Sequence, residues 1–248
     1  MNNINVQLIT FPSFDVPAMI GGMANLTQIK EPFTKTTHDK GLKILKALTT
    51  MGHTSLLECA DFAFIISGAS RVFLAQITRH RVSSFTSQSQ QYQDHSDFPY
   101  LTPKSIDEDP YAKDCYDTIM KDINSAYEYL KDRVGKDDAR YCLPGAARND
   151  LYMKINLREL VTVIMPQRLC RRNTPETKLI LGLMIKAMID AGFEDCVRFG
   201  GCSCITEGHC NQGRMSCKAP YKSWEEMVGI PKCTCVKTHP DYCEVHAA

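Results

Sequence analysis

The segment TRHRVSSFTSQSQQY, Thr78–Tyr92, places three residues that can carry positive charge before an uncharged run of hydroxyl and amide side chains. Arginine presents fork-shaped donors that match phosphate oxygens, and Arg79 and Arg81 supply two such groups. Hydroxyls, amides and free backbone N–H groups in the polar run can line the same anion. For the triplet alone, a basic helix cap is the simpler explanation, because the helix dipole favours cations there. The polar run that follows favours an anion-binding loop.

Two other stretches carry polar groups that could take part in chemistry: GHTSLLE at residues 52–58, and the span 139–172. Taken alone, His53 fits a capping or surface histidine, and Glu58 fits a solvated charge. Ser89 lacks the surroundings of a catalytic nucleophile, since no Ser-His-Asp order or G-x-S-x-G elbow accompanies it. We therefore expect an anion-binding hydroxyl there. The sequence contains no Gly-rich dinucleotide fingerprint and no P-loop, so a nucleotide cofactor would bind outside those folds.

Twelve cysteines are present, and eight of them follow residue 195, where glycine is frequent and no periodicity remains. In a secreted chain this pattern would suggest disulfides, but no other feature indicates secretion. Free thiols in a loop-rich region and a bound zinc ion both stay open. The C-x-C pairs are weaker zinc signals than repeated C-x-x-C pairs. The candidate zinc ligands are Cys202, Cys204, Cys210, Cys217, Cys233 and Cys235.

The composition indicates one large domain with a core, because 44% of the 248 residues are hydrophobic. Its 29 basic and 28 acidic residues leave a net charge of +1, which lacks the excess of positive charge typical of general nucleic-acid binding. Any anion site must therefore be local. No apolar run approaches the roughly 20 residues that span a bilayer. The first residues lack a basic region and a long apolar core, so no signal peptide is expected and the predicted location is cytoplasmic.

Hydrophobic periodicity predicts both strands and helices. Ser70 is a candidate cap for the helix that leads into the arginine triplet. We expect Pro166 to kink or break its helix, and Gly192 to end the last long one. Strands are predicted at residues 5–11, 60–67 and near 153, and helices at residues 36–51, 71–81, 109–134, 156–165 and 175–192. The change of character after Phe193 predicts a catalytic domain at 1–195 and a Cys-rich extension at 196–248.

Together these stretches resemble one family, the flavin-dependent thymidylate synthases. Its signature is Arg-His-Arg followed after seven residues by Ser, which Arg79, His80, Arg81 and Ser89 fit. The tail string G.C…G.MSC is similar to clostridial-type members. Further matches are GHTSLLE (52–58), Ser70-Arg71 with Gln76, AR..LP (139–144), N-x-R-x-L (156–160) and RLC.R...E (168–176).

The resemblance implies an α/β (α+β) fold with a mixed, largely antiparallel central sheet flanked by helices. It implies a homotetramer whose active sites are shared between subunits. The implied activity is the methylation of dUMP to dTMP with FAD, NADPH and methylenetetrahydrofolate. The reduced flavin supplies the hydride and no cysteine attacks the uracil, so the protein binds and orients the reactants. Neither a nucleic-acid polymer nor a membrane is an expected partner.

The family motifs imply three sets of site residues. Arg168 matches the arginine that polarises the uracil ring, where a cation stabilises developing negative charge. The implied FAD contacts are His53, Ser55, Glu58, Arg79, His80, Arg81, Ser87, Asn156, Leu157, Arg158 and Thr162. The implied nucleotide contacts are Gln76, Ile77, Thr78, Arg79, Ser87, Gln88, Ser89, Gln90, Gln91, Arg140 and Arg168.

Several positions depart from the family pattern. Gln91 replaces an arginine that contacts the nucleotide, so the phosphate loses a charged donor. Compared with the family pattern, one extra residue lies between Asn156 and Arg168. A bulge near Pro166 would absorb it, whereas an alignment without a gap would place Gln167 at the position of the arginine. Thus three alternatives stay open: transfer of a hydroxymethyl group, a modified pyrimidine nucleotide as substrate, and a non-catalytic homologue that binds flavin or nucleotide. Other departures are at Thr86, Ser87, Thr162, Pro175 and Lys178.

Overall fold

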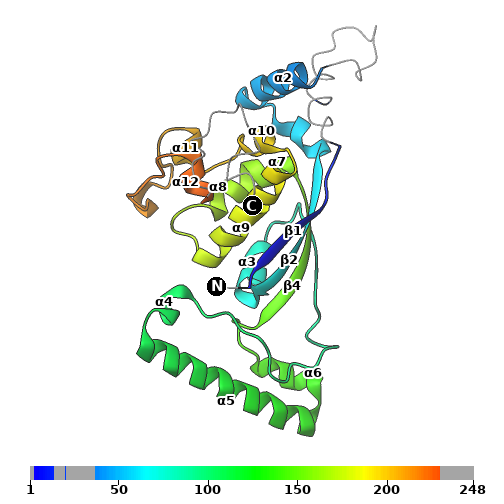
Figure 1. Cartoon of the computed structure of the whole chain (residues 1–248), viewed down its shortest axis with the longest axis vertical. Coiled ribbons are helices and arrows are strands. Elements are labelled where there is room, and N and C mark those ends of the chain that lie inside the picture. Colours follow the sequence, from blue (N-terminus) through cyan, green and yellow to red (C-terminus); the bar gives the residue numbers. More distant parts are fainter. Residues whose placement is uncertain (1–2, 14–19, 21–36, 230–248) are drawn as a thin grey trace, which may run out of the picture. The chain divides into compact units, whose positions relative to one another are not determined.

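The computed structural model describes residues 3–13, 20 and 37–229. Within them, a four-stranded sheet has the strand order β1-β2-β4-β3. Figure 1 labels three of these strands, β1, β2 and β4. The strands are β1 (Asn5–Thr10), β2 (Asp61–Ser70), β3 (Ser84–Ser87) and β4 (Arg148–Asn156). The helical elements are α2 (His38–Thr50), η2 (Thr54–Cys59), α3 (Arg71–Ile77), α4 (Lys104–Asp107), α5 (Pro110–Val134), α6 (Lys136–Ala139), η3 (Arg140–Cys142), α7 (Leu157–Glu159), η4 (Leu160–Ile164), α8 (Met165–Arg168), α9 (Pro175–Asp190), α10 (Glu194–Val197), α11 (Ser203–Thr206), η5 (Gly213–Met215) and α12 (Trp224–Val228).

The two middle strands, β2 and β4, run antiparallel. At one end the N–H of Arg71 donates to the carbonyl of Ala147 at 3.1 Å, and at the other end the N–H of Leu157 donates to the carbonyl of Ala60 at 2.8 Å. Every second residue of β4 is buried, as on a strand with one face against a core. The predicted fold class, α/β (α+β) with a largely antiparallel sheet and flanking helices, is confirmed.

The chain divides into two compact units, residues 1–6 with 65–153 and residues 7–64 with 154–248. The points of division fall inside β1, β2 and β4. Each unit contains a pocket of its own. The predicted boundary between a catalytic domain at 1–195 and an extension at 196–248 stays a prediction.

Helix α3 begins where the sequence predicts, because the hydroxyl of Ser70 accepts a hydrogen bond from the N–H of Phe73 at 3.0 Å. It ends at Ile77, so the predicted extension to residue 81 is wrong. Beyond it, the N–H of His80 returns to the carbonyl of Ile77 at 3.1 Å, which closes a turn. Arg79 therefore lies in that turn, and Arg81 lies in the next one, where the N–H of Ser83 donates to the carbonyl of His80 at 3.1 Å.

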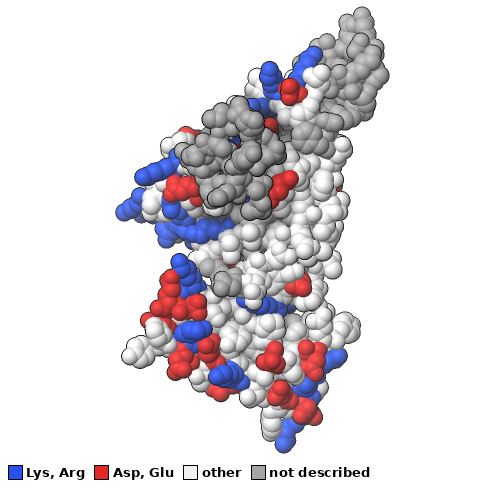
Figure 2. Space-filling view, in the orientation of Figure 1, with Lys and Arg blue, Asp and Glu red and all other residues white. Residues whose placement is uncertain are grey.

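The same unit contains the long helix α5, drawn in green between α4 and α6 in Figure 1. Asp109 caps it by accepting bonds from Tyr111 and Ala112, and Pro110 occupies a first-turn position where no N–H is needed. Met120 packs in a cluster with Phe98 and Ala147. On the face shown in Figure 2, acidic and basic side chains mix over α4 and α5, where several form ion pairs.

In the other unit, α9 contacts α8, α10 and α12. Pro175 opens α9 and Gly192 follows it with φ +89°, as the sequence predicts. In addition, the hydroxyl of Thr174 caps the helix. Seven α9 residues are buried, which makes this helix the centre of the unit's core. The short elements α10 to α12 follow, so the described residues 194–229 form brief helices joined by loops.

The helix around residue 160 continues past its predicted end at Met165, so a break at Pro166 is wrong, whereas a kink there stays a prediction. Its five residues Leu160–Ile164 form a π-helical turn, and α8 then continues through Pro166 to Arg168. A π-helical turn inserted in a helix takes up an additional residue. The extra residue that the family resemblance places near Pro166 agrees with this turn.

Within the described part of the chain, no helix combines the length and the apolar character that a membrane span requires.

Candidate active site

A pocket of about 500 Å³ lies in the unit of residues 65–153. Its polar wall is the end of β3 with the turn that follows, Ser87–Gln90. Arg71 enters from the first position of α3, and Arg140 and Tyr141 enter from η3. Segments up to 70 residues apart in sequence therefore meet around one cavity with cationic, hydroxyl and amide groups.

The backbone of this polar wall is fixed by neighbouring groups. The N–H of Gln88 donates to the carbonyl of Asp150 at 3.3 Å, which extends the pairing of β3 with β4. The carboxylate of Asp150 accepts the N–H of Gly68 at 2.9 Å. Gly68 has φ +75°, and a Cβ there would lie 2.5 Å from the carbonyl oxygen of Asn3, so only glycine fits. In the turn, the N–H of Gln91 donates to the hydroxyl of Ser89 at 3.1 Å.

The two arginines of the pocket are held by neutral acceptors. Arg71 donates to the side-chain oxygen of Asn149 at 3.3 Å, and Arg140 donates from Nε to the carbonyl of Asp137 at 2.9 Å. Within the described residues, neither forms an ion pair with a carboxylate. Burial lowers the pKa of Arg71, since part of the solvent around its cation is excluded. An anion bound in the pocket would therefore stabilise the charged guanidinium of Arg71, which has lost part of its solvation.

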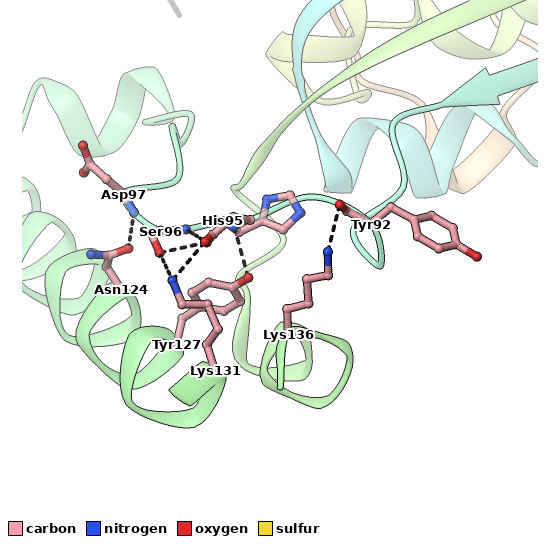
Figure 3. A network of polar contacts seen from close by, with 9 residues as sticks. Tyr92, His95, Ser96, Asp97, Asn124, Tyr127, Lys131 and Lys136 are labelled. Atoms are coloured by element: carbon pink, nitrogen blue, oxygen red, sulfur yellow. Dashed lines mark hydrogen bonds and ion pairs between the residues drawn. The ribbon is translucent and has the colours of Figure 1, made fainter. Parts of the chain in front are cut away.

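The segment after Gln91 is anchored to α5 and α6 by a polar network (Figure 3). Lys136 donates to the carbonyl of Tyr92 at 3.1 Å, and Lys131 forms an ion pair with Asp94 at 3.0 Å. The N–H of His95 donates to the hydroxyl of Tyr127 at 3.1 Å. Hydrogen bonds from Ser96 and Lys131 hold the pKa of Asp94 well below its usual range, so this carboxylate stays ionised at neutral pH. The network fixes the downstream end of the pocket loop.

Only some of the predicted nucleotide residues line this pocket. Ser87, Gln88, Ser89, Gln90 and Arg140 line it, and Gln91 follows directly. Gln76, Ile77, Thr78 and Arg79 instead lie at the end of α3. Ile77 is fully buried, and the hydroxyl of Thr78 donates to the carbonyl of Leu74 at 2.8 Å. We therefore interpret Ile77 as a core residue.

Sequence reasoning did not assign Arg71 and Tyr141 to the site. Arg71 was visible as part of the Ser70-Arg71 motif, but nothing in the local pattern connects it to residues 87–90. The connection requires the antiparallel pairing of β2 with β4, because that pairing brings Arg71 beside Ala147 and Asn149. Tyr141 follows Arg140, whose guanidinium lies 5.8 Å from its ring centroid.

A second group of predicted residues meets in the unit of residues 7–64 and 154–248. Element η2 carries Ser55 and Glu58, follows His53 and contacts α7. Arg158 of α7 forms an ion pair with Glu58, although the two are 100 residues apart in sequence. These side chains are exposed or half-buried.

The remaining residues of this second group belong to the helix itself. Asn156 caps α7 by accepting the N–H of Glu159 at 2.8 Å, and Thr162 donates to the carbonyl of Arg158 at 2.8 Å. Leu157 is fully buried and packs in the core.

In the signature triplet, His80 is 6% exposed whereas Arg79 and Arg81 are exposed. Solvent thus reaches both arginines, whereas the imidazole is buried, and the role of the triplet stays a prediction.

Arg168, the last residue of α8, lines a larger cavity of about 800 Å³ in the second unit. Gln167 and Arg172 also line it, together with the segment 202–204 and the segment 215–221. The cavity thus contains both residues that the two alignments offer for the uracil-polarising role. Gln167 is the more exposed of the two.

This same cavity is lined by five cysteines: Cys170, Cys202, Cys204, Cys210 and Cys217. All nine cysteines of the described part are free thiols. Among the described residues, no three His, Cys, Asp or Glu side chains are arranged to hold one metal ion. Cys233 and Cys235 fall outside the described residues, so zinc stays a prediction.

The fold is shared with a solved structure. A crystal structure of thymidylate synthase X from Helicobacter pylori, with FAD and dUMP, superposes with a TM-score of 0.61 at 17% sequence identity. The match covers 79% of this chain and 99% of that protein. It identifies the fold class as that of thymidylate synthase X.

Sequence similarity identifies the family. The model for thymidylate synthase complementing protein, Thy1, matches residues 17–191. The flavin-dependent thymidylate synthase of Nitratidesulfovibrio vulgaris is 32% identical over 183 residues, covering 70% of this chain and 74% of that protein. The one from Pyrococcus furiosus is 31% identical over 209 residues, covering 79% and 85%. The chain belongs to the flavin-dependent thymidylate synthase family, which confirms the prediction from its motifs.

Proposed function

We propose that this enzyme converts dUMP to dTMP, with FAD as cofactor and NADPH and methylenetetrahydrofolate as co-substrates. The observation that carries the proposal is the pocket in which Arg71 and Arg140 accompany the Ser87–Gln90 turn. Two guanidinium groups with hydroxyl and amide donors suit a nucleoside monophosphate. The similar crystal structure of the Helicobacter pylori protein holds FAD and dUMP, which supports the same ligands here.

In this proposal the phosphate dianion of the nucleotide binds to Arg71 and Arg140. Both guanidinium groups have neutral partners within the described residues, so a bound phosphate would supply their counter-charge. The turn that contains Ser89 adds neutral donors and fixes the orientation of the nucleotide. Because Asp150 and the network around Lys131 already hold the loop in place, little ordering is needed on binding.

The second group of residues is proposed to hold FAD. His53, Ser55 and Arg158 offer imidazole, hydroxyl and guanidinium donors on side chains that solvent reaches. Such donors fit the ring carbonyls and phosphates of a flavin nucleotide. When bound, FAD supplies the hydride that reduces the transferred one-carbon unit. Arg168 is proposed to stabilise the negative charge that develops on the pyrimidine ring.

The proposed enzyme is a cytoplasmic homotetramer with active sites shared between subunits, as the family resemblance implies. Size-exclusion chromatography with light scattering tests the assembly. A mass four times that of the chain supports the tetramer, and the mass of a single chain contradicts it.

Product analysis tests the activity. Purified protein is incubated with dUMP, methylenetetrahydrofolate and NADPH, and the nucleotide is analysed by mass spectrometry. We expect dTMP, which exceeds dUMP by one CH₂ group. A product that retains an additional oxygen would instead show hydroxymethyl transfer. A yellow protein that leaves both dUMP and NADPH unchanged would be the non-catalytic homologue.

Restoring the family arginine gives a prediction about affinity. Gln91→Arg is expected to lower the KM for dUMP by about fivefold, because a charge-assisted hydrogen bond to phosphate exceeds a neutral one by roughly 1 kcal/mol. Gln93→Arg adds the same charge two residues further along and serves as the control. Initial rates of dTMP formation over a range of dUMP concentrations measure both variants. Equal KM values for Gln91→Arg and the parent protein would contradict a role of position 91 at the phosphate.

A further inference from the structure

We propose that the segment from Gly200 to Glu226 positions Arg168, by capping the carbonyl groups at the end of α8 and supporting the π-helical turn before it. This proposal depends on the proposed function, because it assigns Tyr221 and Cys202 a role in catalysis through Arg168. Helix ends leave backbone carbonyls without intrahelical partners, and their orientation fixes the last side chains of the helix.

Side chains donate hydrogen bonds to three backbone carbonyl groups near Arg168. The thiol of Cys202 donates to the carbonyl of Pro166 at 3.6 Å. The amide of Asn173 donates to the carbonyl of Gln167 at 3.2 Å, and the hydroxyl of Tyr221 donates to the carbonyl of Leu169 at 2.9 Å. Two of these three donors come from the segment after residue 199, so the tail holds the helix end that Arg168 occupies.

Two arginines that follow Arg168 in sequence, Arg171 and Arg172, also contact the segment from Gly200 to Glu226. The guanidinium of Arg171 lies 4.2 Å from the ring centroid of Tyr221 and forms an ion pair with Glu226. Arg172 donates to the carbonyl of Met215 at 3.0 Å. Tyr221 is therefore held at its hydroxyl by Leu169 and at its ring by Arg171, so its position is tied to the chain that directly follows Arg168.

The donors stay protonated over the physiological range. Burial raises the pKa of Tyr221 to about 12 and that of Cys202 to about 12. Both groups therefore keep the hydrogen that they donate to the α8 carbonyls, and the contacts are independent of pH near neutrality.

The segment also packs against the π-helical turn. A Cβ on Gly200 would lie 2.6 Å from the sulfur of Met165 and 2.8 Å from Cα of Val161, so the backbone of residue 200 lies directly on that turn. The indole of Trp224 donates to the carbonyl of Gly200 at 2.9 Å, and the N–H of Cys202 is 3.2 Å from the sulfur of Met227. One segment thus contacts the turn before Arg168 and the carbonyls beside it.

Position matters for Arg168 because electrostatic stabilisation requires a donor aimed at the place where charge develops. A displacement of about 1 Å from a distant change can cost roughly a hundredfold in rate. Arg168 reaches the 800 Å³ cavity from a π-containing helix. Its direction depends on the rotation of that helix, which the tail contacts restrain.

Tyr221→Phe tests the proposal, because it removes the hydroxyl and leaves the ring for Arg171. We expect kcat for dTMP formation to fall about fivefold to tenfold, with the KM for dUMP and bound FAD within twofold of the parent. Tyr111→Phe is the matched control, since Tyr111 is 89% exposed on α5. Cys202→Ala is the second variant and should lower kcat in the same direction.

A double-mutant cycle separates positioning from general stability. If Tyr221 acts through Arg168, Tyr221→Phe should cause no further loss of kcat in the Arg168→Ala background. An equal fivefold to tenfold loss in both backgrounds would overturn the proposal, as would a parent-like kcat for both Tyr221→Phe and Cys202→Ala. A parent protein that makes no dTMP would instead overturn the proposed function, so the two failures are distinguishable.

Discussion

Replacing Arg168 with alanine is expected to lower kcat for dTMP formation by about a hundredfold to a thousandfold, with a smaller change in the KM for dUMP. Removing one preorganised donor to a developing negative charge has an effect of this size in other enzymes. The loss falls on kcat because the charge on the pyrimidine ring exists only in the transition state. Single-turnover formation of dTMP, followed by mass spectrometry, measures it.

Gln167→Ala is the control for this prediction, because an ungapped alignment assigns the uracil-polarising role to that position. We expect its kcat to stay within about threefold of the parent, since the π-helical turn at Leu160–Ile164 takes up the extra residue. The reverse order, with Gln167→Ala the more damaging change, would transfer the role to residue 167.

Arg140→Ala is expected to raise the KM for dUMP by about tenfold to a hundredfold, because hydrogen bonds to charged groups contribute roughly 1.5–3 kcal/mol. Initial rates over a range of dUMP concentrations measure this change. Deoxyuridine lacks the phosphate, so its binding should be equal in parent and variant. A matched loss for both ligands would contradict the assignment of Arg140 to the phosphate.

Arg133→Ala is the control for Arg140. Arg133 also stacks on a tyrosine, with its guanidinium 4.8 Å from the ring centroid of Tyr129, but it lies on α5 outside the pocket lining. Its removal deletes the same charge and a comparable stacking contact. The KM for dUMP should therefore remain within twofold of the parent.

The parts of this fold that depend on interactions between neighbouring residues can be predicted from the sequence. Ser70 and Thr174 cap helices because their hydroxyls reach N–H groups three residues away, and Gly192 follows a helix because it accepts a positive φ. The end of α3 at Ile77 was not predicted, because residues 78–81 contain no glycine or proline to end the helix, whereas a turn at His80 competes with it. Propensity alone does not decide between these two.

The candidate site was predictable in its residue types and less so in its grouping. Family motifs name Ser89 and Arg140, and the structure brings both to one pocket. Arg71 enters that pocket through strand pairing, which local periodicity does not reveal. In the same way, the contact between Arg158 and Glu58 joins motifs 100 residues apart. The roles of these residues stay predictions until the variants are measured.

The cysteines that line the cavity beside Arg168 offer a way to detect a bound molecule there. Cys170, Cys204 and Cys217 are half-buried in the wall of the same cavity and carry no disulfide. A molecule that fills the cavity would shield them from an alkylating reagent such as iodoacetamide. The rate of alkylation at each of these cysteines therefore reports whether a molecule occupies the cavity beside Arg168. The measurement needs neither an added fluorescent label nor an activity assay.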